Sequence, residues 1–162
     1  MTEDTKPANP GVRFPPPFFF IAGLLLAWLF ERRIHGLPLA LQAGSLSTLR
    51  DVGYLLVLIG VGIAAWGMVT FSRAHTAIIP MKPASSLVET GPYRFTRNPM
   101  YTGITVAYLG GAFLLNSGWA MIFLPVVLLL LYRFVIRREE NYLSAEFGEA
   151  YTSYRSRVKR WI

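Results

Sequence analysis

The stretch 52-VGYLLVLIGVGIAAWGMVTF-71 decides the fold class, because it is twenty residues long and carries no charged side chain. Coiled as an α-helix, such a segment is long enough to cross about 30 Å of hydrocarbon. Gly53, Gly60 and Gly67 recur in it every seven residues, and small residues at a helical spacing let two backbones approach closely in lipid. The stretch therefore predicts a membrane helix packed closely against a neighbour. Reading 60-GVG-62 as part of a cofactor motif is the weaker interpretation.

Three further apolar segments, 14–30, about 100–115 and 119–136, flank this one. Each is near the length of a membrane span. In the third segment along the chain Gly103, Ala107 and Gly111 follow one another every four residues, a second helix-packing pattern. The short connection 116-NSG-118 predicts that the last two spans form an antiparallel hairpin. We expect an all-α polytopic membrane protein with about four transmembrane helices and a C-terminal cytoplasmic helix.

The chain divides into three parts of one domain. Residues 1–13 are acidic and proline-bearing, without the basic start and small-residue cleavage site of a secretory signal, and we expect a disordered tail there. Residues 14–71 hold two spans, and residues 72–162 hold a long loop, the hairpin and a polar tail. Whether the first apolar segment spans fully is left open by its length.

Composition agrees with a membrane protein. Of 162 residues 53% are hydrophobic and 15% are charged, unlike a typical soluble domain. There is no cysteine, which excludes disulfides and thiolate chemistry. The net charge of +7 comes from basic residues beside apolar runs, which favours a membrane surface over nucleic acid.

The basic residues also predict an orientation. With four spans, only Arg32, Arg33 and Arg50 lie on one side, and most other basic residues share the side of both termini and the 72–99 loop. The positive-inside rule places that side in the cytoplasm of a plasma or inner membrane.

The polar loop before the third span ends in 91-GPYRFTRNPMY-101. Asn98 suits the N-cap of a helix and Pro99 its first position. A helix start flanked by Arg94 and Arg97 favours a carboxylate or phosphate, and anchoring of the arginines to lipid head groups is the alternative.

The helical pattern of the fourth span continues into a tail rich in charged residues. Arg133, Arg137, Glu140 and Ser144 follow at intervals of four, three and four, which places them on one helical face; ordinary exposed ion pairs would give the same pattern. Since Glu139 and Glu140 are neighbours, we expect one to enter a site and the other to face water. Further on, 147-FGEAYTSY-154 predicts a break at the glycine, followed by a short helix.

Two motifs together carry a family resemblance. The segments 87-LVETGPYRFTRNPMYTG-103 and 139-EENYLSAEFGEAYTSYRSRV-158, separated by a tight hairpin, resemble the isoprenylcysteine carboxyl methyltransferase family and its phospholipid N-methyltransferase relatives. The resemblance covers residues from about 72 to the end of the chain. It implies methyl transfer from S-adenosylmethionine to a lipophilic small molecule in the bilayer, and no metal site.

The resemblance also implies which residues act. A carboxylate of the cofactor suits Arg97 and the helix start, the ribose suits Glu140, and the sulfonium suits tyrosine rings. The full set of implied cofactor residues is Tyr93, Arg97, Asn98, Tyr101, Gly103, Glu139, Glu140, Tyr151 and Tyr154. The implied catalytic residues are Arg133, Arg137 and Glu140, with Arg133 or Arg137 holding an acceptor carboxylate through a bidentate contact.

Two departures from the family pattern leave the identity of the methyl acceptor open. Asn98 stands where family members often have histidine, and asparagine cannot titrate; His75 upstream is a candidate substitute. The end 158-VKRW-161 differs from the tail of the eukaryotic enzymes, so another lipid acid, a thiol or an amine competes with isoprenylcysteine. A nicotinamide-dependent membrane reductase with a similar helical core and a lipid-binding subunit without activity remain as alternatives. Oligomeric state is not predicted.

Overall fold

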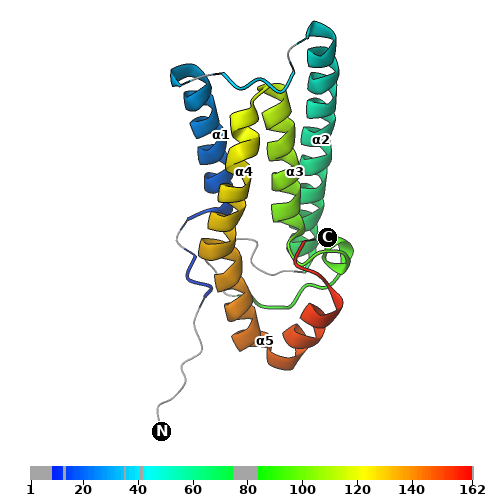
Figure 1. Cartoon of the computed structure of the whole chain (residues 1–162). Coiled ribbons are helices and arrows are strands. Elements are labelled where there is room, and N and C mark those ends of the chain that lie inside the picture. Colours follow the sequence, from blue (N-terminus) through cyan, green and yellow to red (C-terminus); the bar gives the residue numbers. More distant parts are fainter. Residues whose placement is uncertain (1–8, 13, 35, 41, 75–83, 162) are drawn as a thin grey trace.

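The computed structural model describes residues 9–12, 14–34, 36–40, 42–74 and 84–161. Four helices stand side by side in it (Figure 1), in the order α1 (Pro16–Arg33), α2 (Ala43–Arg73), α3 (Pro99–Leu114) and α4 (Gly118–Leu131). A 3-10 turn, Gly91–Arg94, precedes α3. A π-helical turn, Tyr132–Ile136, joins α4 to α5 (Arg137–Arg157). The described residues form no strand, and their one isolated β-bridge pairs Pro38 with Ser117. The chain is therefore all-α, as predicted.

Two helical stretches, Gly44–Arg73 and Gly118–Arg157, are long and apolar enough to cross a membrane. Large apolar side chains point outward on three helices, with Ile21 58%, Leu58 71% and Leu129 63% exposed. Contiguous apolar surface of this kind needs a lipid or protein covering. α1, with 18 residues, and α3, with 16, are shorter, so the count of four spans stays a prediction.

α3 packs most extensively along α2, and glycines make this contact. A methyl group on Gly60 would lie 2.5 Å from both the Ala107 nitrogen and the Gly103 carbonyl oxygen. A methyl on Gly110 would lie 2.6 Å from the Gly53 carbonyl oxygen. The predicted glycine pattern thus marks the α2–α3 interface. Gly111, predicted on the same stripe, instead faces Leu24 of α1, because the stripe on α3 follows Gly103, Ala107 and Gly110.

α4 packs along α1, although it follows α3 directly in the chain. Gly23 of α1 makes room for Val127 of α4, and Phe30 packs edge-on against Trp119 and Phe123. Each helix of the hairpin therefore has its main partner among the first two helices. The hairpin itself turns at Asn116, whose φ of 49° is left-handed.

Polar contacts connect the chain segments at the end of the bundle that holds the Asn116 turn. The Asn116 side chain accepts from the Ala40 N–H and donates to the Ala40 carbonyl. Glu31 accepts from the Leu37 N–H and from the Ser117 hydroxyl. These bonds attach the α1–α2 connection to the hairpin turn.

The opposite end of the bundle holds α5, the tail that follows it and the segment before α3 (Figure 1). α5 bends at Gly148, where φ is 52° and ψ is −121°, so the predicted glycine break is confirmed. Residues 9–12 correct the expectation of a disordered tail over 1–13. Val12 is 5% exposed within the apolar core, and the Gly11 carbonyl accepts from Arg138; burial of one apolar side chain fixes this short segment. Residues 1–8 and 13 lie outside the described chain.

Candidate functional site

A cavity lies at this second end of the bundle, between the last turns of α2, the segment 84–101 and both halves of α5. Most of its wall is aromatic or aliphatic, including Phe71, Met100 and Leu143. Eight of the nine cofactor residues implied by the sequence line it: Tyr93, Arg97, Asn98, Tyr101, Glu139, Glu140, Tyr151 and Tyr154. Segments 38 or more residues apart in the chain thus meet around one space.

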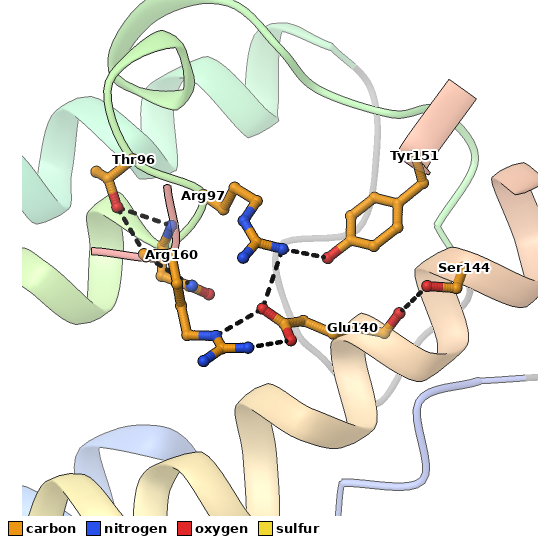
Figure 2. Close-up of polar contacts among 7 residues, drawn as sticks. Thr96, Arg97, Glu140, Ser144, Tyr151 and Arg160 are labelled. Atoms are coloured by element: carbon orange, nitrogen blue, oxygen red, sulfur yellow. Dashed lines mark hydrogen bonds and ion pairs between the residues drawn. The ribbon is translucent and has the colours of Figure 1, made fainter. Parts of the chain in front are cut away.

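Glu140 is the centre of the polar network in this cavity (Figure 2). Arg160 binds it through two hydrogen bonds of 2.8 Å, one from Nε and one from Nη2. Nη1 of Arg97 lies 3.2 Å from the same carboxylate and 3.3 Å from the Tyr151 hydroxyl. The Glu140 side chain is only 11% exposed. Two guanidinium groups therefore compensate one buried carboxylate.

The C-terminal tail is held against the segment before α3. The Arg160 carbonyl accepts from the Thr96 hydroxyl and from Nδ2 of Asn98, both at 3.0 Å, and the Arg97 N–H donates to the Lys159 carbonyl at 2.9 Å. Asn98 does stand at the N-cap position of α3, but its side chain makes no capping bond. The N-cap position predicted for Asn98 is confirmed, and its side-chain amide donates to the tail.

Glu139 also belongs to the cavity, which corrects the expectation that one of the two glutamates faces water. Its Oε1 accepts a hydrogen bond of 2.7 Å from the Tyr101 hydroxyl of α3, and both glutamates line the space. The two neighbours can both point inward because the cavity wraps around the start of α5. Glu139 lies in polar α5, beyond the apolar part of the helix. Burial raises its pKa to about 7, the Tyr101 hydrogen bond opposes this, and the Glu140 charge adds to it.

Tyrosines from α5 and the 3-10 turn complete the wall. The Tyr154 hydroxyl donates to the Tyr93 carbonyl at 2.8 Å, and burial raises the pKa of both phenols, so they stay neutral. The Tyr93 hydroxyl and Nε of Arg97 are buried without a hydrogen-bond partner in the described part of the chain. Unpartnered buried donors are costly, and here they line a cavity. Such a site suits a ligand with an acidic or strongly polar group.

Three implied residues lie elsewhere. Arg133 and Arg137 are exposed and are not among the residues that line the cavity. Arg133 lies within the π-turn, where the spacing departs from that of an α-helix, whereas Arg137 is the first residue of α5. Gly103 lies at the α2–α3 interface, where a methyl group would meet the Gly60 carbonyl oxygen at 2.5 Å. His75 lies outside the described residues.

Arg160 is the main site residue that sequence reasoning missed. It belongs to a basic tail that resembled a membrane-surface segment, and no spacing connects it with Glu140 twenty residues earlier. Tyr142 was missed too; its hydroxyl accepts from the Ala84 N–H at 3.0 Å and it lines the cavity. Its place inside the second motif was the available signal. Among the described residues no group of three His, Cys, Asp or Glu side chains is arranged to hold a metal ion.

Fold and site together define a helical protein with an apolar bundle and, at one end of it, a tyrosine-lined cavity that contains a buried ion-pair network. The model of the phospholipid methyltransferase family matches residues 49–150, and the chain belongs to this family. This confirms the resemblance carried by the two motifs.

Individual relatives agree with the family. Over 109 residues the chain is 31% identical to a protein-S-isoprenylcysteine O-methyltransferase of Saccharomyces cerevisiae, covering 66% of this chain and 46% of the relative. Over 110 residues it is 27% identical to protein-S-isoprenylcysteine O-methyltransferase B of Arabidopsis thaliana, covering 67% and 56%. The nickel-cobalt-cadmium resistance protein NccN of Alcaligenes xylosoxydans xylosoxydans is 33% identical over 100 residues, covering 61% and 47%. The chain thus spans about half the length of these relatives. No solved structure is significantly similar to it.

Proposed function

We propose that the protein is a multi-pass membrane methyltransferase that uses S-adenosylmethionine and methylates a lipophilic acceptor in the bilayer. The observation that carries this proposal is the meeting of the two family motifs in one cavity, where Arg97 of the first lies 3.2 Å from Glu140 of the second. The names of the relatives, O-methyltransferases of isoprenylcysteine, support the reaction class. The basic side of the bundle, with this cavity, faces the cytoplasm.

The cavity suits a cofactor with a carboxylate at one end. Nε of Arg97 and the Tyr93 hydroxyl are buried donors without a partner among the described residues, and a guanidinium binds carboxylates strongly. The ribose hydroxyls would donate to Glu140, by the logic of acidic residues in dinucleotide sites. Asn98 would remain a structural link to the tail through the Arg160 carbonyl.

The cavity also suits the cationic part of the cofactor. Aromatic rings attract cations over their faces, and Tyr101, Tyr151 and Tyr154 line the space. When bound, S-adenosylmethionine supplies an activated methyl group on a sulfonium. The chain then has to hold and align the reactants and exclude water, which contributes several kcal/mol to catalysis in well-oriented reactions.

The acceptor approaches from the lipid side. α1 and α3 would complete the four spans as short or tilted helices. The sequence predicted a carboxylate acceptor held by Arg133 or Arg137. Both side chains are exposed and outside the cavity lining, so a carboxylate bound to either would lie outside the cavity.

Calorimetric titration of S-adenosylhomocysteine into the purified full chain tests the function. We expect binding by the wild type, strong weakening in Glu140→Gln, and unchanged binding in Glu149→Gln, which alters an exposed glutamate of the same helix. Arg97→Ala and its exposed neighbour Arg94→Ala form a second matched pair. Binding that is equal in Glu140→Gln and wild type would refute the assignment of this cavity.

NADPH titrated in the same experiment separates the alternatives. A nicotinamide-dependent reductase would bind NADPH and not S-adenosylhomocysteine. A lipid-binding subunit without activity would bind neither, while the folded state is verified independently by circular dichroism and size-exclusion chromatography.

A further inference from the structure

Two neighbouring glutamates in the cavity have opposite surroundings. Glu140 receives Arg160 through two hydrogen bonds and Arg97 at 3.2 Å. Glu139 has no ion pair with any described residue and accepts one hydrogen bond, at 2.7 Å, from the Tyr101 hydroxyl. When two carboxyl groups of one site have such different surroundings, their pKa values differ and they take different roles in acid–base chemistry. Glu140 is held by two guanidinium groups, whereas Glu139, without a cationic partner among the described residues, is placed to take up a proton.

The groups around Glu139 support this separation. α3 contributes the Tyr101 hydroxyl, the 3-10 turn contributes the neutral Tyr93, and α5 contributes the Glu140 charge. On the other walls α2 contributes Phe71 and the N-terminal segment contributes Pro10, neither of which carries a charge. Burial outweighs the Tyr101 hydrogen bond and raises the pKa of Glu139 to about 7, so the group exchanges its proton in the neutral range.

We propose that Glu139 is the proton acceptor of the site and that the methyl acceptor is protic, an amine, alcohol or thiol, rather than a carboxylate. This inference rests on the proposed function and deepens it. The unpartnered Tyr93 hydroxyl, on a side chain 4% exposed, and Nε of Arg97 show independently that the space is built for a ligand. An acceptor carboxylate inside the cavity would meet the carboxylates of Glu139 and Glu140, which line the same space.

The step balances in atoms and charge. The lone pair of the acceptor nitrogen, oxygen or sulfur forms the bond to the methyl carbon while the carbon–sulfur bond of the sulfonium breaks. The bonding electrons of that broken bond remain on sulfur and neutralise it. The proton of the acceptor N–H, O–H or S–H passes to the Glu139 carboxylate, which leaves a neutral methylated product and a protonated Glu139. Tyr101 is a positioning residue that orients Glu139.

Proton release on cofactor binding tests Glu139 without any turnover. Calorimetric titrations of S-adenosylmethionine at pH 7, in two buffers of different ionisation enthalpy, measure the protons released. The cationic sulfonium favours ionised Glu139, and about half a proton per site should leave a group whose pKa lies near the buffer pH. S-adenosylhomocysteine, which lacks that charge, should release fewer. The difference should vanish in Glu139→Gln and persist in Glu149→Gln.

The outcomes separate the inference from the proposed function. If neither ligand binds to the folded wild type, the proposed function fails. If both ligands bind and release the same number of protons, or if Glu139→Gln releases as many as wild type, only the Glu139 assignment fails. Proton release confined to chains with Glu139 supports it.

The acceptor class has its own test, with hexadecylamine, hexadecanol, hexadecanethiol and hexadecanoate supplied in nanodiscs. Transfer to a protic acceptor should fall roughly 100-fold in Glu139→Gln, the ordinary loss for a missing general base. Transfer to hexadecanoate alone would overturn the inference, as would transfer to a protic acceptor that Glu139→Gln leaves unchanged. If the wild type methylates none of the four, the proton-release result decides.

Discussion

Gly60→Ala should loosen the α2–α3 contact. A methyl group at Gly60 would lie 2.5 Å from the Ala107 nitrogen and the Gly103 carbonyl oxygen, and 2.9 Å from Cα of Ala107. All three are backbone atoms, so no side chain can rotate away, and the helices have to separate. Gly62, on the same helix, has no atom within 4 Å of an added methyl group, which makes Gly62→Ala a matched control.

The magnitude follows from two opposed effects. Forcing extra volume into a packed interface costs about 1–3 kcal/mol. The methyl group of Gly60→Ala would meet only backbone atoms, which cannot move aside, so we expect a cost at the upper end of this range. Replacing a helical glycine by alanine returns up to about 1 kcal/mol through helix propensity, in both variants. We expect Gly60→Ala to be less stable than Gly62→Ala by about 2–3 kcal/mol, or roughly 5–10 °C in melting temperature for a chain of this size.

Tryptophan fluorescence during heating measures this difference in detergent, with size-exclusion chromatography to confirm that each variant is folded. The comparison between the two variants holds even if unfolding is irreversible, provided the heating rate is the same. Gly103→Ala should reproduce the loss, because its methyl group would lie 2.5 Å from the Gly60 carbonyl oxygen. Equal melting temperatures for Gly60→Ala and Gly62→Ala would refute the close packing of α2 and α3.

Three other predictions test the cavity end of the bundle. Gly148→Ala should destabilise the chain by about 1–3 kcal/mol, because a φ of 52° is strained for a residue with a side chain, even though open space surrounds the added methyl group. A melting temperature equal to that of the wild type would contradict the bend of α5 at Gly148. Glu139→Gln should stabilise the chain above pH 7 by up to about 3 kcal/mol and leave its stability unchanged at pH 4. The pKa of Glu139 is raised from 4.5 to about 7 in the folded chain, so its contribution to the free energy of unfolding is complete below pH 4.5 and is lost as pH rises through 7. Thermal melts across pH check this, and a difference that does not depend on pH would contradict it. Arg160→Ala should release the tail. Hydrogen exchange at the Arg97 N–H, which donates to the Lys159 carbonyl, should then speed up about tenfold. Arg157→Ala, which changes a side chain that is 62% exposed, is the control, and equal exchange rates in both variants would show that Arg160 does not hold the tail.

Much of the site follows from its two motifs. Tyr93, Arg97, Tyr101, Tyr151 and Tyr154 were expected from the sequence to share a ligand, and they line one cavity. The motifs name residue types and order, and the helix break at glycine brings the last two tyrosines back toward the bundle. Their roles toward a cofactor remain proposals.

Side-chain direction at the start of α5 could not be predicted in the same way. A regular helix would place Arg133 and Glu140 on one face, but Arg133 lies in a π-turn at Tyr132–Ile136. Arg137 follows that turn in α5, yet its side chain is exposed and outside the cavity lining. Nothing in the composition of that turn distinguishes it from α-helix.

The sequence by itself determined the helical membrane class, the glycine contact between α2 and α3 and the break at Gly148. Each depends on residues close together in the chain: an uncharged run of sufficient length, small residues at a helical period, or a residue without a Cβ. Only the tertiary structure decided that Arg160 closes on Glu140, that Glu139 and Glu140 both enter the cavity, and that Asn98 binds the tail. Those contacts join residues 20 to 62 positions apart, and their geometry exists only after the helices have packed and α5 has bent back toward them.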